Sequence, residues 1–79
     1  MQVYTVAVRT FTDTQGHEWE AATAFGSYGA VQLIFSRRAG NELRSCGMQA
    51  ETLRDAEQEL ADCTELALRE RLHRAEPWR

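Results

Sequence analysis

The sequence predicts an α+β domain, in which an antiparallel β-meander of three to four strands is followed by a C-terminal αα-hairpin packed on one sheet face. Three observations lead to this expectation. Side chains alternate with a period of two as far as Gly47, short clusters of turn residues interrupt the alternation, and after Met48 the apolar residues recur at steps of three and four. At 79 residues the chain has the length of one domain, so we expect residues 1-79 to form a single domain.

The first two strands are expected at residues 3-11 and 17-25. β-Branched residues recur on alternate positions of the first segment. The turn between the strands contains Asp13, whose side chain can accept hydrogen bonds from nearby backbone groups, and Gly16, which can adopt a positive φ. Trp19 lies on the aromatic side of the second strand, opposite a side of small and polar residues, so it should point into the core.

The third and fourth strands are expected at residues 31-36 and 42-47. Val31, Leu33 and Phe35 share one face of the third strand and are predicted core residues. The fourth strand is the weakest of the four, because a glycine interrupts it and few of its residues are apolar.

Two helices are expected at residues 50-61 and 64-75. The apolar stripe of the first consists of Ala50, Leu53, Ala56, Leu60 and Cys63. Asp62 precedes Glu65 by three residues, which is the spacing of a capping box with Asp62 as the N-cap, and Pro77 should end the second helix. The short break between the helices predicts an antiparallel αα-hairpin.

The composition is that of an ordinary globular protein, with 43% hydrophobic and 27% charged residues. The net charge of −3 and the pI near 5.3 argue against general nucleic-acid binding. All nine basic residues other than histidine are arginine, which is typical of a GC-rich, bacterial genome. Two cysteines are too few for a disulfide-rich secreted domain, and the chain shows no signal peptide or membrane span, so we expect reduced thiols and a cytoplasmic protein.

No complete catalytic or metal-binding motif is present. Residues 26-29 (Gly-Ser-Tyr-Gly) lack the spacing of a nucleophile elbow and precede a strand rather than a helix, so they indicate a plain turn. His17 and His73 do not stand at metal-ligand spacing from either cysteine. We expect no catalytic residue, no metal and no cofactor. A thiol enzyme or hydrolase that pairs Cys46 or Cys63 with one of these histidines is the least favoured alternative.

Acidic residues recur on the first predicted helix at steps of four, four and three, which places them within one quadrant. They are Glu51, Asp55, Glu59 and Asp62. Like charges at this spacing destabilise a helix by about 0.2–0.5 kcal/mol per pair. The quadrant is either a solvated outer face or an acidic ridge that docks a basic partner.

Four arginines lie near predicted strand ends: Arg9, Arg37, Arg38 and Arg44. A meander should gather the first three at one end of the sheet, with the fourth in reach. Such a basic rim could bind phosphate or carboxylate groups bidentately, or it could only keep a loop soluble. Tyr28, at the tip of a turn, would be a contact residue beside it.

Trp78 follows a proline at the C-terminal end of the chain. Terminal residues are usually frayed, yet tryptophan has a large apolar surface that is costly to leave in water. The side chain should therefore either fold back over the core or anchor an interface.

Several short motifs form a pattern that resembles small uncharacterised bacterial proteins of similar length. The motifs are Phe11-Thr12-Asp13 with Gly16 and Trp19, then Ser27-Tyr28-Gly29 before an apolar strand, and then Pro77-Trp78. The resemblance covers most of the chain. It implies a bacterial origin, and no activity, ligand or partner is carried over from it.

The first functional hypothesis is a non-enzymatic protein-interaction or regulatory module that binds a protein partner or its own copy. The second is a nucleic-acid-binding module that uses the basic rim with Tyr28 as a stacking platform. The candidate interaction surface comprises Glu51, Asp55, Glu59, Asp62, Arg9, Arg37, Arg38, Arg44, Tyr28 and Trp78.

Overall fold

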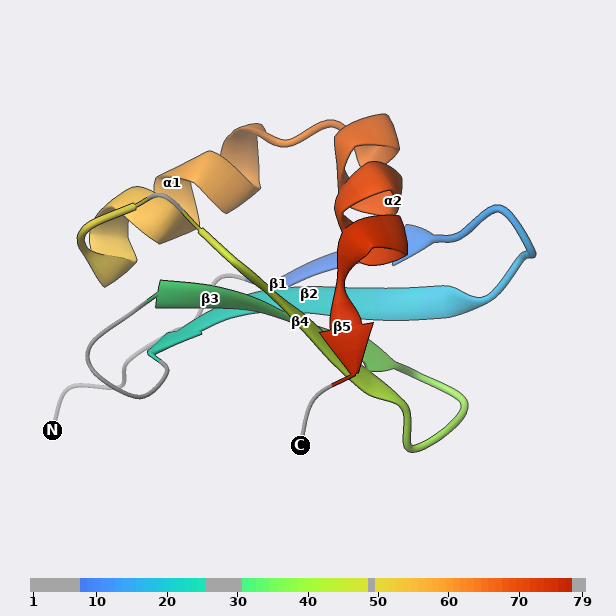
Figure 1. Ribbon diagram of the computed structural model, residues 1–79. Coiled ribbons are helices and arrows are strands. Elements are labelled where there is room, and N and C mark those ends of the chain that lie inside the picture. Colours follow the sequence, from blue (N-terminus) through green and yellow to red (C-terminus); the bar gives the residue numbers. More distant parts are fainter. Residues whose placement is uncertain (1–7, 26–30, 49, 78–79) are drawn as a thin grey trace, which may run out of the picture.

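The computed structural model describes residues 8–25, 31–48 and 50–77. Its elements are β1 (Val8–Thr12), β2 (Glu18–Phe25), β3 (Val31–Arg37), β4 (Leu43–Gly47), α1 (Leu53–Asp62), α2 (Glu65–Arg74) and β5 (Glu76–Pro77). The strands form one sheet in the order β1-β2-β3-β4-β5, with every neighbouring pair antiparallel. Figure 1 shows α1 and α2 on the same side of this sheet. The predicted α+β class, with a meander followed by two helices, is confirmed.

The predicted strands agree closely with the described ones. The weakest prediction, the fourth strand, forms as β4 and pairs along its whole length with β3. In the first strand the described part, β1, continues to Thr12, one residue beyond the predicted end. Residues 3–7 of that prediction, together with Tyr28 and Trp78, lie outside the described residues.

The helix boundaries differ from the prediction because threonine hydroxyls cap both helices. The hydroxyl of Thr52 accepts the N–H of Asp55, so α1 begins at Leu53 rather than at residue 50. The hydroxyl of Thr64 accepts the N–H of Ala67 and starts α2. The prediction that Asp62 is the second N-cap was wrong, since Asp62 is the last residue of α1.

Pro77 does not end α2, which is a second correction. The helix ends at Arg74, where the N–H of the C-cap residue Ala75 bonds to the carbonyl of Leu72. The chain then extends and forms β5, which pairs with Arg44 and Ser45 of β4. Proline is tolerated in an edge strand because its missing N–H can face away from the ladder.

The hydrophobic core lies between the helices and one face of the sheet. Its residues are Phe11, Trp19, Ala21, Leu33, Phe35, Leu60, Leu68 and Leu72. Trp19 is only 2% exposed, and Val31, Leu33 and Phe35 are buried as predicted. The rings of Phe11 and Phe35 meet edge to face at a centroid distance of 5.8 Å. Each strand therefore directs alternate side chains into this layer.

No helix of the described residues lies on the opposite face of the sheet (Figure 1). Val8 is 49% exposed and Leu43 is 38% exposed there, and Ala22, Ala24 and Ile34 are partly exposed. The register places Val8, Ala22 and Ile34 in one row across three strands. We call this surface the open sheet face. Among the described residues, no helix is both long and apolar enough to cross a bilayer.

Candidate functional site

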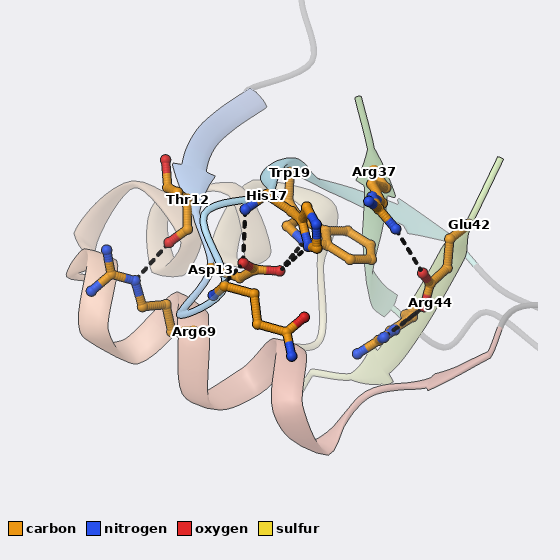
Figure 2. Close-up of polar contacts among 9 residues, drawn as sticks. Thr12, Asp13, His17, Trp19, Arg37, Glu42, Arg44 and Arg69 are labelled. Carbon is orange, nitrogen blue, oxygen red and sulfur yellow. Dashed lines mark hydrogen bonds and ion pairs between the residues drawn. The ribbon is translucent and has the colours of Figure 1, made fainter. Parts of the chain in front are cut away.

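The β1–β2 turn is organised by the carboxylate of Asp13. Gly16 adopts φ +86°, which closes the turn, and the N–H of Asp13 donates to the carbonyl of His17 at 2.8 Å. Asp13 Oδ1 accepts the backbone N–H groups of Gln15 and His17, at 2.8 and 2.9 Å. Asp13 Oδ2 accepts the indole N–H of Trp19 at 2.8 Å (Figure 2). The turn residues expected from the sequence thus also fix the main core side chain.

These bonds stabilise the charged form of Asp13. Partial burial raises the pKa of its carboxyl, but the bonds from the Trp19 indole and from the backbone of His17 and Gln15 outweigh burial. The result is a pKa lowered to about 2. The His17 ring lies nearby, with 3.5 Å between Nδ1 and Oδ2. The carboxylate therefore serves the turn and is not poised as a proton acceptor at neutral pH.

Arg9 projects from β1 to the end of α1. Its Nη1 atom donates to the carbonyl oxygens of Leu60, Ala61 and Cys63 at 2.9, 3.1 and 3.0 Å. The last carbonyls of a helix lack internal partners and carry partial negative charge, and the last turn of α1 has no basic residue of its own. A guanidinium from the sheet supplies both the donors and the charge.

The other three arginines of the predicted rim also have partners within the chain. Arg38 pairs with Glu18 and Glu20 at 3.6 and 3.4 Å. Arg37 lies 4.0 Å from Glu42 Oε1. Glu42 Oε2 accepts a hydrogen bond from Nε of Arg44 and forms an ion pair with its Nη2, both at 2.6 Å (Figure 2).

The structure does not gather the four arginines into one rim. Arg37 shares a sheet row with Trp19, on the helix side, whereas Arg38 binds carboxylates of the open sheet face. Arg9 lies beside the end of α1. Arg44 is on the helix side, with its guanidinium 5.1 Å from the centroid of the Trp19 ring.

The four acids of the predicted quadrant likewise lie in different surroundings and do not form one exposed ridge. Glu51 precedes α1, and Asp55 lies exposed in its first turn. Glu59 accepts a hydrogen bond from Nη1 of Arg71 on α2 at 3.0 Å. Asp62 accepts the side-chain amide of Gln58 at 3.2 Å. Glu59 thus joins the two helices, which leaves Asp55 and Asp62 as the exposed acids of α1 from that set.

A cleft of about 570 Å³ separates the β1–β2 turn from α2. Its lining residues are Asp13, Thr14, Gln15, Arg44, Leu66, Arg69, Glu70, Leu72, His73 and Arg74. We call it the turn–helix cleft. Arg69 bridges its two sides, since its Nε donates to the carbonyl of Thr12 at 2.6 Å (Figure 2). Its Nη2 donates to Glu65 on α2 at 2.7 Å.

A second cleft, of about 400 Å³, lies between β4 and the helices and is lined in part by Cys46. Burial raises the pKa of the Cys46 thiol; Arg71 opposes this shift, and Glu59 and Cys63 add to it. A raised pKa leaves little thiolate at neutral pH, which is the reverse of an activated cysteine. Among the described residues, neither cysteine forms a hydrogen bond with a histidine.

Two features of the site were not predicted from the sequence. Arg69 and Arg74 were not candidates, because helical spacing shows only that they are polar and does not show what lies opposite them. The open sheet face could be recognised in part from the sequence, because small and polar residues alternate with the residues of the aromatic side along β2. That alternation does not reveal whether a helix covers the face.

The described residues contain no cluster of three or more histidine, cysteine, aspartate or glutamate side chains that could hold a metal ion. The residues that the structure does bring together are the arginines and carboxylates of the turn–helix cleft and the small apolar residues of the open sheet face.

The chain matches no protein-family model, no curated protein and no solved structure.

Proposed function

We propose that this protein is a small non-enzymatic protein-interaction module that binds a partner through the open sheet face. The observation that carries the proposal is the asymmetry of the sheet. Both helices cover one face, while the other leaves Val8 and Leu43 exposed beside partly exposed Ala22 and Ile34. A contiguous apolar surface rimmed by polar residues is typical of an interaction site.

The charges around this face favour a partner with basic residues at its rim. The register puts Glu18, Glu20 and Glu76 on the open side, with Arg38 bonded to the first two. Three carboxylates against one guanidinium give the described part of the face a negative balance. Packing two copies face to face would bring surfaces of the same sign together, so we favour a different protein over a second copy.

A matched pair of variants tests the proposal. Ala22→Arg places a cation in the centre of the open sheet face, and Ala61→Arg makes the same change at an exposed position on α1. The full chain is immobilised and used to capture proteins from its native cell. We expect a partner that wild type and Ala61→Arg retain and that Ala22→Arg loses, with circular dichroism showing that both variants are folded.

Equal capture by both variants would contradict the proposal. So would a dimer, measured by light scattering, that Ala22→Arg dissociates, because the face would then be occupied by a second copy. Salt-sensitive binding to an oligonucleotide would instead support the alternative, a nucleic-acid-binding module. The bacterial origin and cytoplasmic location expected from the sequence stay predictions.

A further inference from the structure

The turn–helix cleft has the size of a ligand site and lies on the helix side of the sheet. Its volume of about 570 Å³ falls within the range of about 300–1,000 Å³ that is usual for binding pockets. One wall is the β1–β2 turn, and the other is the face of α2 that carries Leu66, Glu70 and His73. The proposed partner surface is on the opposite face of the sheet, so the two sites are independent.

Two guanidinium groups of the cleft are held in place by other contacts. Arg44 uses Nε and Nη2 for Glu42 and lies over the Trp19 ring. Arg69 uses Nε for the carbonyl of Thr12 and Nη2 for Glu65. Nη1 of each has no hydrogen bond to any described residue. The site therefore offers positioned N–H donors whose ordering cost is already met by folding.

The third guanidinium is without a partner in the described part of the chain. Arg74 is the last residue of α2, is exposed, and lines both clefts, and it takes part in no hydrogen bond or ion pair with a described residue. Arginine forms planar, bidentate hydrogen bonds with carboxylates. Arg74 is therefore the most available anion-binding group of the cleft.

The balance of charges favours carboxylates over a polyanion. Three arginines line the cleft, but Arg44 is already paired with Glu42 and Arg69 with Glu65. Arg74 is therefore the lining arginine that has no carboxylate partner among the described residues. One unpaired guanidinium beside two partly free ones suits a few carboxylates but gives little of the counterion release that drives nucleic-acid binding.

An apolar contact lies beside these donors. Leu66, on the cleft-facing side of α2, is 68% exposed, which is a large exposed fraction for leucine. Leu66 stands one helical turn before Arg69 and two turns before Arg74, since α2 is continuous over this range. Along α2, from its N-terminal to its C-terminal end, a bound segment would thus contact an apolar position and then two cationic positions.

We propose that the turn–helix cleft binds an acidic peptide segment of a partner protein. An apolar side chain of the segment packs on Leu66, and its carboxylates accept hydrogen bonds from Arg74 and from the free Nη1 atoms of Arg44 and Arg69. Recognition of acidic motifs by clustered arginines is a common mode of peptide binding.

The test is a titration of the ¹⁵N-labelled full chain with a blocked peptide that contains leucine followed by three glutamates. We expect amide shifts concentrated at Thr14, Gln15 and Glu70. The Kd should rise about threefold or more in Arg74→Ala and in Leu66→Ser, as expected for the loss of an exposed ion pair or an apolar contact. Arg54→Ala, which removes an exposed arginine of α1, should leave the Kd unchanged.

Several results would overturn the proposal. They are an equal Kd for Arg74→Ala and Arg54→Ala, shifts that map to the open sheet face, or no binding at millimolar peptide. Tighter binding of inorganic phosphate or of a single-stranded oligonucleotide than of the peptide would assign the arginines to phosphate instead. The result is independent of whether a partner binds the open sheet face, because Ala22→Arg leaves every cleft residue in place.

Discussion

Asp13 connects the charge state of one residue to the order of the β1–β2 turn. Its carboxylate accepts two backbone N–H groups and the Trp19 indole, so the turn and the core depend on the same acceptor. A protonated carboxyl carries no negative charge and keeps less acceptor capacity, so these bonds would be weaker.

This arrangement predicts a specific loss of stability in acid. The pKa of Asp13 is lowered from 3.8 to about 2 on folding, so its carboxylate stabilises the folded state above the unfolded pKa, and this contribution is lost as the pH falls from about 4 to about 2. Urea unfolding at a series of pH values should show a shallower decline over this range for Asp13→Asn than for wild type. Parallel declines would contradict the assignment.

Arg9 stabilises the fold through partners that are distant in the sequence, the carbonyl groups at the end of α1. Arg9→Ala should lower the free energy of unfolding by about 1.5–3 kcal/mol, the range for hydrogen bonds to a charged group. Arg9→Lys should restore only part of this loss, because an ammonium lacks the planar geometry of a guanidinium.

Chemical denaturation of Arg9→Ala, Arg9→Lys and the control Arg54→Ala measures these effects. Arg54 is an exposed arginine of α1, and removing it should change stability by less than about 0.5 kcal/mol. If all three variants had the stability of the wild type, the carbonyl contacts of Arg9 would contribute nothing in solution.

At the scale of elements, Thr64 caps the start of α2, whereas nearby Asp62 does not. Thr64→Ala removes the cap on the Ala67 N–H and should cost about 0.5–2 kcal/mol, whereas Thr64→Ser keeps the hydroxyl and most of the stability. Asp62→Ala should have little effect or be slightly stabilising, because an acid at the C-terminal end of α1 opposes the helix dipole. Thermal unfolding monitored by circular dichroism ranks the three variants, and a larger loss for Asp62→Ala would restore it as the cap.

Strand and helix positions followed from side-chain periodicity, because alternation and the three- or four-residue step reflect local geometry. The turn at Asp13 and Gly16 was predicted for the same reason, since its chemistry is local. β5 was missed because two residues carry no periodic signal and the pairing depends on β4, which lies about thirty residues earlier.

The candidate site was predicted less well than the fold. Arginines were expected at strand ends, but their partners come from other elements, as the bond from Arg69 to Thr12 illustrates. Sequence spacing can place two residues on one helix face, as it did for Asp55 and Glu59. It cannot show that Glu59 turns toward Arg71 of the next helix.

For the whole molecule, the asymmetry of the sheet predicts that truncating two adjacent residues of β3 to alanine lowers the free energy of unfolding by unequal amounts. Leu33 is fully buried under the helices, so Leu33→Ala should cost about 2–5 kcal/mol. Ile34 points to the open sheet face and is partly exposed, so Ile34→Ala should cost about 1 kcal/mol, the span of strand preferences. Urea denaturation of both variants compares them, and equal losses would mean that the second face is covered in the isolated protein.

The bonds of Arg9 have a consequence for the order in which the chain folds. They join residues 51, 52 and 54 positions apart, whereas the hairpins β1–β2 and β3–β4 close over a few residues. Long-range contacts pay the largest loop-closure entropy and tend to form after local ones. The guanidinium should therefore engage the end of α1 after the folding transition state, so that its removal accelerates unfolding and leaves the refolding rate almost unchanged. The link between the first strand and the helices would then govern how long the native state persists, not how quickly it is reached.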